Sequence, residues 1–378
     1  MGLDIDSIVY LRKWLCKLAQ TDIGCIKFNV DTELVEVILF DKQEDGSKKF
    51  AFGFDEFIDK IDLTDISFSG VDVRNIDFTG SKGVKINPQT IWGKDMRKAK
   101  LNGVEIECSL EDPFAGVDIT STDFTGSKGA KINPQAVRDK SMEAATLGNV
   151  EITGPFDDVC IRNTNFTGSK GAKINPQTVF ICSMEGTILN GVEIIGSFDY
   201  VDICGTDFTG SKGAKIDPQT VPYGEMAGTK FKDAEIIGSF DECQISEVDF
   251  TGSKGAKVNP QTVWNKDLFY TTLCDTEIIG LFDDVDICGT DFTGSKGAKI
   301  DLQAIRNKDL TGTILCDAEI TGSLDGIYIY DADFKGSNFK SLSITEILDI
   351  LDTISDLENA DSGQKGGFET SDVQKIKK

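Results

Sequence analysis

Apolar and polar residues follow a short, strict pattern through most of this chain. From Ile61 onwards, consecutive five-residue units each contain an apolar residue, a polar residue, a large apolar residue and two small or polar residues. Ile61-Asp-Leu-Thr-Asp and Ile76-Asp-Phe-Thr-Gly are two examples. A unit this short and this regular favours a repetitive fold.

A longer repeat is superimposed on the short one. Near copies of residues 207–221 recur along the chain, and a phenylalanine at the second position of each copy marks the period. These residues are Phe78, Phe124, Phe166, Phe208, Phe250, Phe292 and Phe334, so the first step is 46 residues and every later step is 42. Self-similarity at a fixed period predicts a stacked, quasi-one-dimensional fold.

The large apolar positions within one repeat indicate its geometry. After Phe250 they fall at Val258, Val263, Leu268, Leu273, Ile278, Phe282, Ile287 and Phe292, which is eight sides and hence two four-sided coils. Laying the coils over one another gives one column of only Phe and Leu, and a neighbouring column of only Ile and Val. The longest step contains the insertion Gly252-Ser-Lys-Gly255, which we expect to form a loop at one corner.

These units resemble those of the pentapeptide repeat family, whose unit is A(D/N)LxX. The resemblance covers roughly residues 61–340. It implies a right-handed quadrilateral β-helix in which the central residue of each unit and the residue two before it point inward. We therefore expect an all-β solenoid of about thirteen coils. The resemblance also implies a soluble protein of bacterial or phage origin.

The two ends of the chain do not fit the repeat. The pattern of residues 1–60 predicts an α+β module with a helix over residues 4–19, a small antiparallel sheet and a short helix near Asp55–Asp62. This module either caps the open end of the solenoid or binds a ligand independently. Residues 341–359 predict an amphipathic helix with Ser343 as its N-cap, which caps the C-terminal end or mediates dimerisation. The polar, Gly-rich residues 360–378 are expected to be disordered.

One side of each repeat is ambiguous. In residues 259–263 the inward position holds Gln261, and five residues later it holds Lys266. Asn-Pro is also a favourable start for a helix. An extended side and a single helical turn both remain open.

Composition argues against several kinds of function. A net charge of −24 and a pI near 4.4 disfavour direct nucleic-acid binding, because contact with phosphates needs clustered Lys and Arg. The chain has no histidine and no Cys-x-x-Cys pair, and Gly80-Ser-Lys-Gly83 lacks the spacing of a phosphate-binding loop. We expect neither an enzyme nor a bound cofactor or metal ion. The coil geometry keeps the nearest cysteines beyond disulfide reach, so we expect reduced thiols.

The sequence also bears on location. No stretch is long and apolar enough for a transmembrane helix, and the N-terminus lacks the regions of a signal peptide. We expect no membrane association and a cytoplasmic location. The resemblance to bacterial effectors that carry such a β-helix leaves secretion as the alternative.

Outward positions beside the Ile column alternate in charge. They are Lys85, Glu105, Lys131, Glu151, Lys173, Glu193, Lys215, Glu235, Lys257, Glu277, Lys299 and Glu319. Stacking opposite charges at one strand spacing helps to set register, so this face is expected to be structural. A second row of lysines (Lys82, Lys128, Lys170, Lys212, Lys254 and Lys296) is expected on another corner.

A second outward column is acidic, and we refer to it as the acidic column. Its charged members are Asp72, Asp95, Asp118, Asp202, Glu225, Asp267, Asp286 and Asp309, and the neighbouring edge adds Asp241, Asp283 and Asp284. No Lys or Arg lies within the column. It is either a solvated face that prevents aggregation or a candidate partner-binding face.

We expect a non-catalytic scaffold whose long faces bind a protein partner, with a basic partner favoured by the charge. The resemblance implies an alternative, since some pentapeptide repeat proteins are acidic DNA mimics that bind type II topoisomerases. Homodimerisation through a terminal cap is left open.

Overall fold

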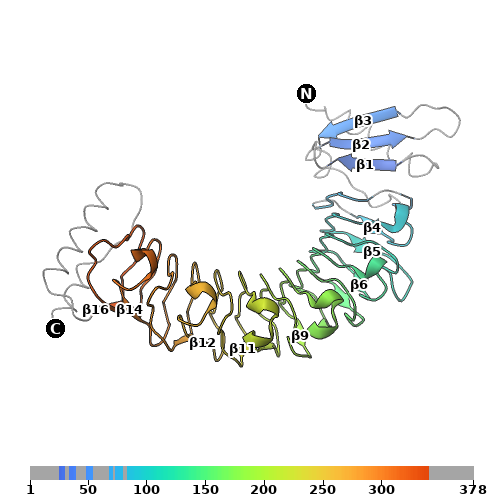
Figure 1. The fold of residues 1–378 in the computed structure, drawn as a ribbon. Helices are drawn as coiled ribbons and strands as arrows, with labels where there is room; N and C mark the ends of the chain where they lie inside the picture. The colour runs from blue at the N-terminus through green and yellow to red at the C-terminus, as the bar shows by residue number, and fades with distance from the viewer. Residues whose placement is uncertain are drawn as a thin grey trace. The chain divides into compact units, whose positions relative to one another are not determined.

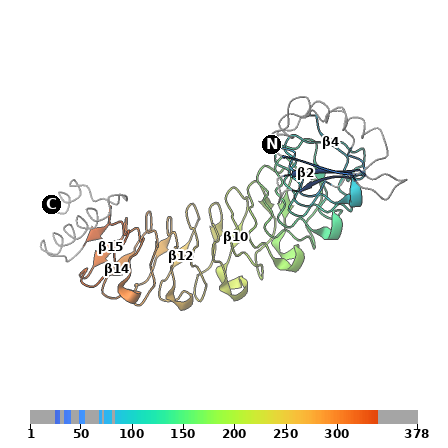
Figure 2. The same cartoon turned by 90° about the horizontal axis from the view of Figure 1, so that it is seen from above.

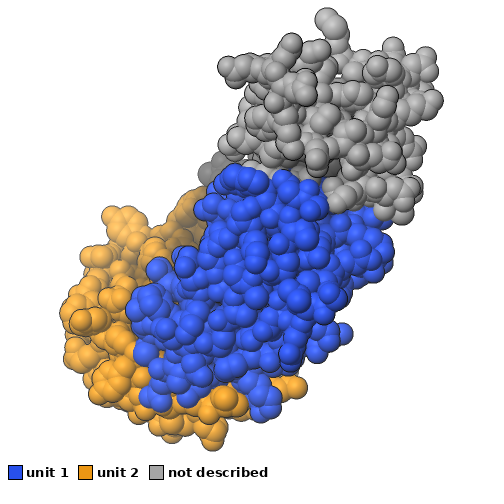
Figure 3. All heavy atoms as spheres, turned by 90° about the vertical axis from the view of Figure 1, so that its right-hand side faces the viewer, with its two compact units in different colours: residues 1–183, 187–193 blue, residues 184–186, 194–378 orange. Residues whose placement is uncertain are grey.

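The computed structural model of the chain describes residues 68–70, 73–79 and 83–339 with their side chains, and the main chain of three strands nearer the N-terminus. The chain divides into two units, shown in blue and orange in Figure 3. Unit 1 comprises residues 1–183 and 187–193, and unit 2 comprises residues 184–186 and 194–378.

An antiparallel three-stranded sheet belongs to the N-terminal part of unit 1. It consists of β1 (Cys25–Asn29), β2 (Leu34–Leu39) and β3 (Lys48–Gly53), with β2 in the middle. Cys25 is the register partner of Ile38, and Leu34 that of Gly53. This agrees with the sheet predicted within residues 1–60. The helices predicted over residues 4–19 and near 55–62 lie outside the described residues.

The rest of the described chain is a parallel β-solenoid of about 13 turns, whose repeats lie about 20 residues apart. Figures 1 and 2 show the turns of each unit following one another. The strands are β4 (Lys85–Ile86), β5 (Glu105–Ile106), β6 (Lys131–Ile132), β7 (Glu151–Ile152), β8 (Lys173–Ile174), β9 (Glu193–Ile194), β10 (Lys215–Ile216), β11 (Glu235–Ile236), β12 (Lys257–Val258), β13 (Glu277–Ile278), β14 (Lys299–Asp301), β15 (Glu319–Thr321) and β16 (Asn338–Phe339). They are short because each side of a turn is only a few residues long.

The strands pair in parallel between neighbouring turns. β4 pairs with β5 and β6 with β7 in unit 1, while β10 pairs with β11, β12 with β13, and β14 with β15 and then β16 in unit 2. Lys215 is the register partner of Glu235, and their side chains form an ion pair at 3.0 Å. The predicted step from a Lys to the Glu of the next turn is therefore confirmed as a pair of opposite charges. The predicted step from that Glu to the next Lys of the column is not, because the following turn supplies Lys128, Lys170, Lys254 and Lys296 as the bridge partners.

The interior is filled by the apolar columns that the repeat predicts. All eight large apolar positions predicted after Phe250 in its repeat are buried. Aromatic rings in unit 2 stack along the interior, with the Phe231 and Phe250 centroids 5.5 Å apart and Phe240 edge-on to Phe250 at 5.1 Å. Burying one such ring stabilises the fold by several kcal/mol, on the order of 3–5 by comparison with truncation to Ala.

Buried threonines add polar links between turns. The Oγ1–H of each donates to a main-chain carbonyl 22 to 26 residues earlier at 2.7–2.9 Å, and these residues are Thr122, Thr164, Thr187, Thr206, Thr229, Thr271, Thr290 and Thr313. A buried hydroxyl costs free energy when it has no hydrogen-bond partner. These bonds give each of the threonine hydroxyls a partner inside the solenoid.

The ambiguous Asn-Pro-Gln side forms tight turns. Short 3-10 turns lie at η2 (Trp92–Lys94), η3 (Arg138–Lys140), η4 (Pro176–Thr178), η5 (Phe180–Cys182), η6 (Pro218–Thr220), η7 (Pro222–Gly224), η8 (Trp264–Lys266) and η9 (Arg306–Lys308). The side chain of Gln261, which fits the pattern poorly, donates its Nε2–H to the Leu281 carbonyl at 3.1 Å and to the Asp283 carbonyl at 2.8 Å. A glutamine at this position therefore bonds to the next turn.

The Gly-Ser-Lys-Gly insertion turns at its glycines, as predicted, because Gly252 and Gly255 have φ values of +74° and +77°, but Lys254 between them takes part in strand pairing. Lys254 is the parallel bridge partner of Glu235 in the preceding turn, and the Ile236 N–H donates to the Lys254 carbonyl at 2.8 Å. Ser253 is buried, and its N–H donates to the Phe250 carbonyl at 2.9 Å, which closes the turn at Gly252. Gly255 follows at φ +77°, where an added Cβ would lie 2.8 Å from the Ile236 carbonyl oxygen.

The same bridge recurs along the chain and corrects the position expected for the second lysine row. Bridges join Lys128, Lys170, Lys254 and Lys296 to the glutamates of the alternating column. These lysines therefore lie on the same side as that column. Lys82 lies outside the described residues.

Several other predictions concern residues outside the described part of the chain. They are the amphipathic helix over residues 341–359, the disordered tail over residues 360–378, and the capping roles of both ends. In the part of the chain that the structure describes, no helix has the length and apolar character needed to span a membrane.

Candidate functional site

The acidic column exists as aligned residues in neighbouring turns. Parallel bridges join Asp95 to Asp118 in unit 1, and Glu225 to Gln244, Asp267 to Asp286 and Asp309 to Tyr328 in unit 2. Asp202 belongs to the same column, since its carbonyl accepts the Met184 N–H at 2.8 Å. Asp72 lies outside the described residues. The structure thus brings four of the predicted acids together as two pairs, while Glu225 and Asp309 each face a neutral side chain.

Most of these carboxylates hold the main chain in its turns. One oxygen accepts the N–H of the residue two positions later at 2.8–3.1 Å in Asp95, Asp118, Asp202, Asp267, Asp286 and Asp309. Asp favours turns because its short side chain can make this bond. Sequence reasoning missed this role, although the same residue type recurs at other turns. Asp207, for example, accepts the Thr209 N–H at 2.9 Å.

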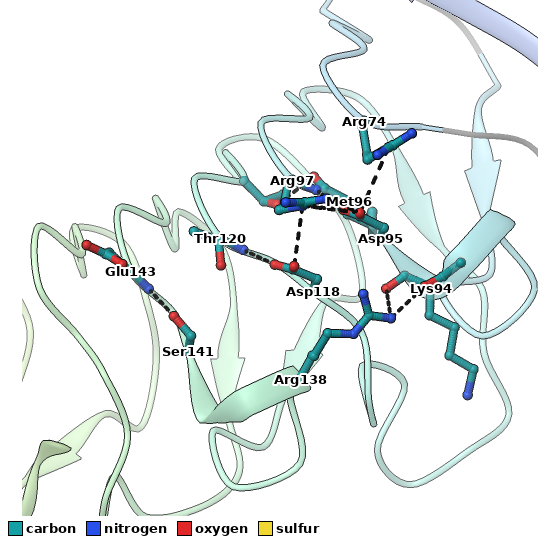
Figure 4. A network of polar contacts seen from close by, with 12 residues as sticks. Arg74, Lys94, Asp95, Met96, Arg97, Asp118, Thr120, Arg138, Ser141 and Glu143 are labelled. Atoms are coloured by element: carbon teal, nitrogen blue, oxygen red, sulfur yellow. Dashed lines mark hydrogen bonds and ion pairs between the residues drawn. The ribbon is translucent and has the colours of Figure 1, made fainter.

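In unit 1 arginines neutralise the column (Figure 4). Arg97 Nη2 lies 2.7 Å from Asp95 Oδ2, and its Nε lies 3.3 Å from Asp118 Oδ2, while Arg74 Nε approaches Asp95 at 3.9 Å. The compensating charge comes from Arg97, which lies two residues after Asp95 and therefore outside the column. Burial raises the pKa of Asp95, but hydrogen bonds from Arg97 and the positive charges outweigh it and hold the pKa below the usual 3.8.

In unit 2 the column is less compensated. Among the described residues, no ion pair reaches Glu225, Asp267, Asp286 or Asp309. The nearby Lys266 instead donates to the Asp283 carbonyl at 3.4 Å, and Lys308 to Gln303 Oε1 at 2.7 Å. Negative charge is therefore concentrated on unit 2 rather than spread evenly.

The neighbouring edge carries Asp241, Asp283 and Asp284, all exposed. The Ser239 hydroxyl donates to Asp241 at 2.9 Å, and the Thr262 hydroxyl donates to its other oxygen. Arg306 Nε lies 3.7 Å from Asp284. The three residues therefore differ in their surroundings, and only Asp284 forms an ion pair within the described chain.

Exposed aromatic residues accompany the acids in unit 2, and the sequence analysis did not single them out. Tyr223 is 92% exposed and Trp264 57% exposed, and both lie in the η turns beside the acidic edge. Tyr270 packs edge-on against Phe269 at 4.4 Å, and Tyr328 occupies the column itself. Their outward positions in the five-residue pattern are the signal that could have identified them.

Metal binding and thiol reactivity are two chemistries that acids and cysteines can supply. No group of three or more His, Cys, Asp or Glu residues that could hold a metal ion occurs among the described residues. The eight described cysteines are free. Burial, followed by the charges of Asp241, Asp217 and Glu242, raises the pKa of the Cys243 thiol to about 12. A thiol this weakly ionised is a poor nucleophile.

Comparison of the chain with models of known protein families and with curated protein sequences finds no match.

Proposed function

We propose that the chain is a non-catalytic scaffold that binds a protein partner through the outer surface of its solenoid. The observation that carries this proposal is the group of exposed aromatic side chains beside poorly compensated carboxylates in unit 2, with Tyr223 and Trp264 the clearest cases. Aromatic residues are enriched in protein interfaces, and exposing several of them on one surface is unfavourable without a partner.

The proposal includes the finer architecture that the sequence predicts. Its elements are a right-handed quadrilateral β-helix of the pentapeptide repeat type, an N-terminal module over residues 1–60 and a capping helix over residues 341–359. The buried central residues at steps of four or five support the four-sided coil. The free thiols support a reducing, cytoplasmic compartment.

Affinity capture with the full-length protein tests the proposal. A triple variant, Tyr223→Ser, Trp264→Ser and Tyr270→Ser, removes exposed aromatic rings from unit 2, and Trp92→Ser removes an exposed ring from unit 1 as the control. We expect native lysate to supply a protein that is retained by the wild type and by the control but lost with the triple variant. Recovery of no specific protein, together with turnover of a substrate, would overturn the proposal.

An acidic DNA mimic, directed at a DNA-binding protein such as a type II topoisomerase, is the second candidate. It is favoured by the register of Asp267 and Asp286, which are bridge partners and so place carboxylates at one strand spacing, about 4.8 Å. B-DNA carries its charge more densely, with one charge per about 1.7 Å of axis. The hydrogen bonds that Asp267 and Asp286 make within their turns also give these acids a structural role that needs no partner.

Gyrase supercoiling with titrated protein at two salt concentrations tests the mimic. Asp267→Asn plus Asp286→Asn removes the charges while an amide oxygen can still accept the turn bonds. Salt-sensitive inhibition that this double variant weakens would support mimicry. Supercoiling unaffected by the wild-type protein excludes gyrase as the target.

A further inference from the structure

Two arginines of the chain each donate to a main-chain carbonyl of the preceding repeat at equivalent corners. In unit 1, Arg138 Nη2 donates to the Gly93 carbonyl at 2.5 Å and to the Lys94 carbonyl at 3.1 Å (Figure 4). In unit 2, Arg306 Nη2 donates to the Asn265 carbonyl at 2.7 Å, and its Nε lies 3.7 Å from Asp284. Each guanidinium extends across one intervening turn to a carbonyl of the preceding repeat.

The 42-residue period identifies the equivalent corner one repeat before Arg306. Trp264 replaces the arginine, Tyr223 replaces Asn265 as the source of the carbonyl, and Glu242 replaces Asp284 as the acid. The carbonyl and the acid that hold Arg306 therefore have counterparts here, without the arginine.

A second cation is also missing from this corner. In unit 1, Lys140 Nζ forms an ion pair with Asp158 at 3.5 Å, and Asp158 is the counterpart of Glu242. The residue equivalent to Lys140 beside Glu242 is Gly224. Within the described chain no ion pair reaches Glu242, and no hydrogen bond reaches the Tyr223 carbonyl.

The surroundings of this corner are suited to a cation. Tyr223 and Trp264 are exposed on either side of Glu242 in chain order, and Asp241 adds a second carboxylate. The same negative charges contribute, after burial, to the raised pKa of the Cys243 thiol. Aromatic faces attract cations, and a guanidinium stacks on them while it donates to a carboxylate and a carbonyl.

We propose that the corner formed by Tyr223, Glu242 and Trp264 binds an arginine side chain of a basic protein partner, in the manner in which Arg306 is bound one repeat later. The inference rests on the proposed protein-binding function and names the chemistry of the partner. Arginine is favoured over lysine because its planar group presents several donors at fixed angles, whereas the ammonium of lysine is a compact point charge.

Fluorescence anisotropy with two labelled probes, a nona-arginine and a nona-lysine peptide, tests the inference on the full chain at about 0.15 M salt. The variants are Glu242→Gln and Trp264→Arg, the second of which supplies the chain's own arginine to the corner. Glu247→Gln is the matched control, because it changes the net charge by the same amount on an exposed residue of the same turn.

We expect each of the two corner variants to weaken nona-arginine binding by about fivefold or more, and Glu247→Gln by less than about twofold. The nona-lysine probe should be affected less. Arg306→Ala vacates the corner at Asp284 and should strengthen nona-arginine binding. Circular dichroism spectra that match the wild type establish that each variant is folded.

Equal weakening by Glu242→Gln and Glu247→Gln would overturn the inference, since it would mean that only the overall charge matters. Unchanged or tighter binding by Trp264→Arg would overturn it as well. The peptide assay needs no natural partner, so its failure is distinct from that of the scaffold proposal. A lysate protein retained equally by the wild type and Glu242→Gln would refute the arginine corner alone.

Discussion

In unit 1, Asp95 and Asp118 share the guanidinium of Arg97, whereas in unit 2 the aligned Asp267 and Asp286 have no ion-pair partner among the described residues. The exposed aromatic residues of the two units also differ in whether a cation of the chain covers the ring. Trp92 of unit 1 lies under Arg74, whose guanidinium carbon is 5.0 Å from the ring centroid, while Tyr223 of unit 2 is almost fully exposed.

The interiors of the two units do not show this difference. Phe124 and Phe250 are both fully buried, and each is edge-on to another phenylalanine, at 5.4 Å and 5.1 Å respectively. The inward positions thus maintain the fold in both units, and the outward positions are free to differ. The exposed aromatic rings and unpaired carboxylates that support the proposed function therefore lie in the outward residues of unit 2.

The largest expected effect is a difference in thiol reactivity. Cys243 of unit 2 is buried, with its pKa raised from 9.0 to about 12, which lowers the thiolate fraction at neutral pH roughly a thousandfold. We expect iodoacetamide at pH 7.5 to alkylate Cys243 at least about a hundredfold more slowly than the half-buried Cys182 of unit 1. Peptide mass spectrometry measures both rates. Similar rates in the folded protein would contradict the prediction, and unfolding in urea should remove the difference.

Core truncation tests whether the interiors are equivalent. Phe124→Ala in unit 1 and Phe250→Ala in unit 2 should each cost about 3–5 kcal/mol, because each leaves a cavity in a close-packed column. Phe250 should lie at the upper end, since it contacts both Phe231 and Phe240. Urea unfolding followed by circular dichroism measures the loss. A cost below about 1 kcal/mol at either site would show that the turn repacks.

The carboxylate network of unit 1 should matter less than the core. Arg97→Ala removes the strongest partner of the buried Asp95, and we expect a loss of about 1–3 kcal/mol. Arg97→Lys retains the charge without the planar donors and should restore part of the loss. Denaturant titration of the three proteins provides the measurement, and an unchanged midpoint for Arg97→Ala would refute a stabilising role.

The pH dependence of this network follows from the direction of the pKa shift. The pKa of Asp95 is lower in the folded chain than its usual 3.8, so the ionised form is stabilised by folding. Its contribution is present above pH 3.8 and is lost as the pH falls through the folded value. Arg97→Ala should therefore differ most from the wild type above pH 3.8 and converge with it in stronger acid.

The smallest expected effect concerns a feature shared by both units. Glu235→Gln in unit 2 and Glu151→Gln in unit 1 each remove an exposed ladder ion pair, and we expect losses below about 1 kcal/mol that shrink further in high salt. Thermal unfolding at low and high salt measures the change. A large loss in only one unit would mean that the ladder is not equivalent between them.

The residues pointing inward were predictable from the sequence alone. Burial of one apolar residue at every fourth or fifth position requires the chain to return to the same place in each turn, so Val258 to Phe292 could be placed without coordinates. The Lys215 and Glu235 ladder follows from the same count, because equivalent positions in successive turns become neighbours.

Only the tertiary structure decided where the polar groups find their partners. Lys254 bridges to Glu235 because the turn at Gly252 brings the chain back to the side that holds Glu235, with Ser253 buried. Arg306 reaches Asn265, forty-one positions away in the chain, because a long side chain can cross the turn between them. The apolar period specifies which residues are buried, but the direction and reach of a side chain depend on the shape of neighbouring turns. The proposed recognition of a partner therefore depends on contacts that the repeat pattern alone does not specify.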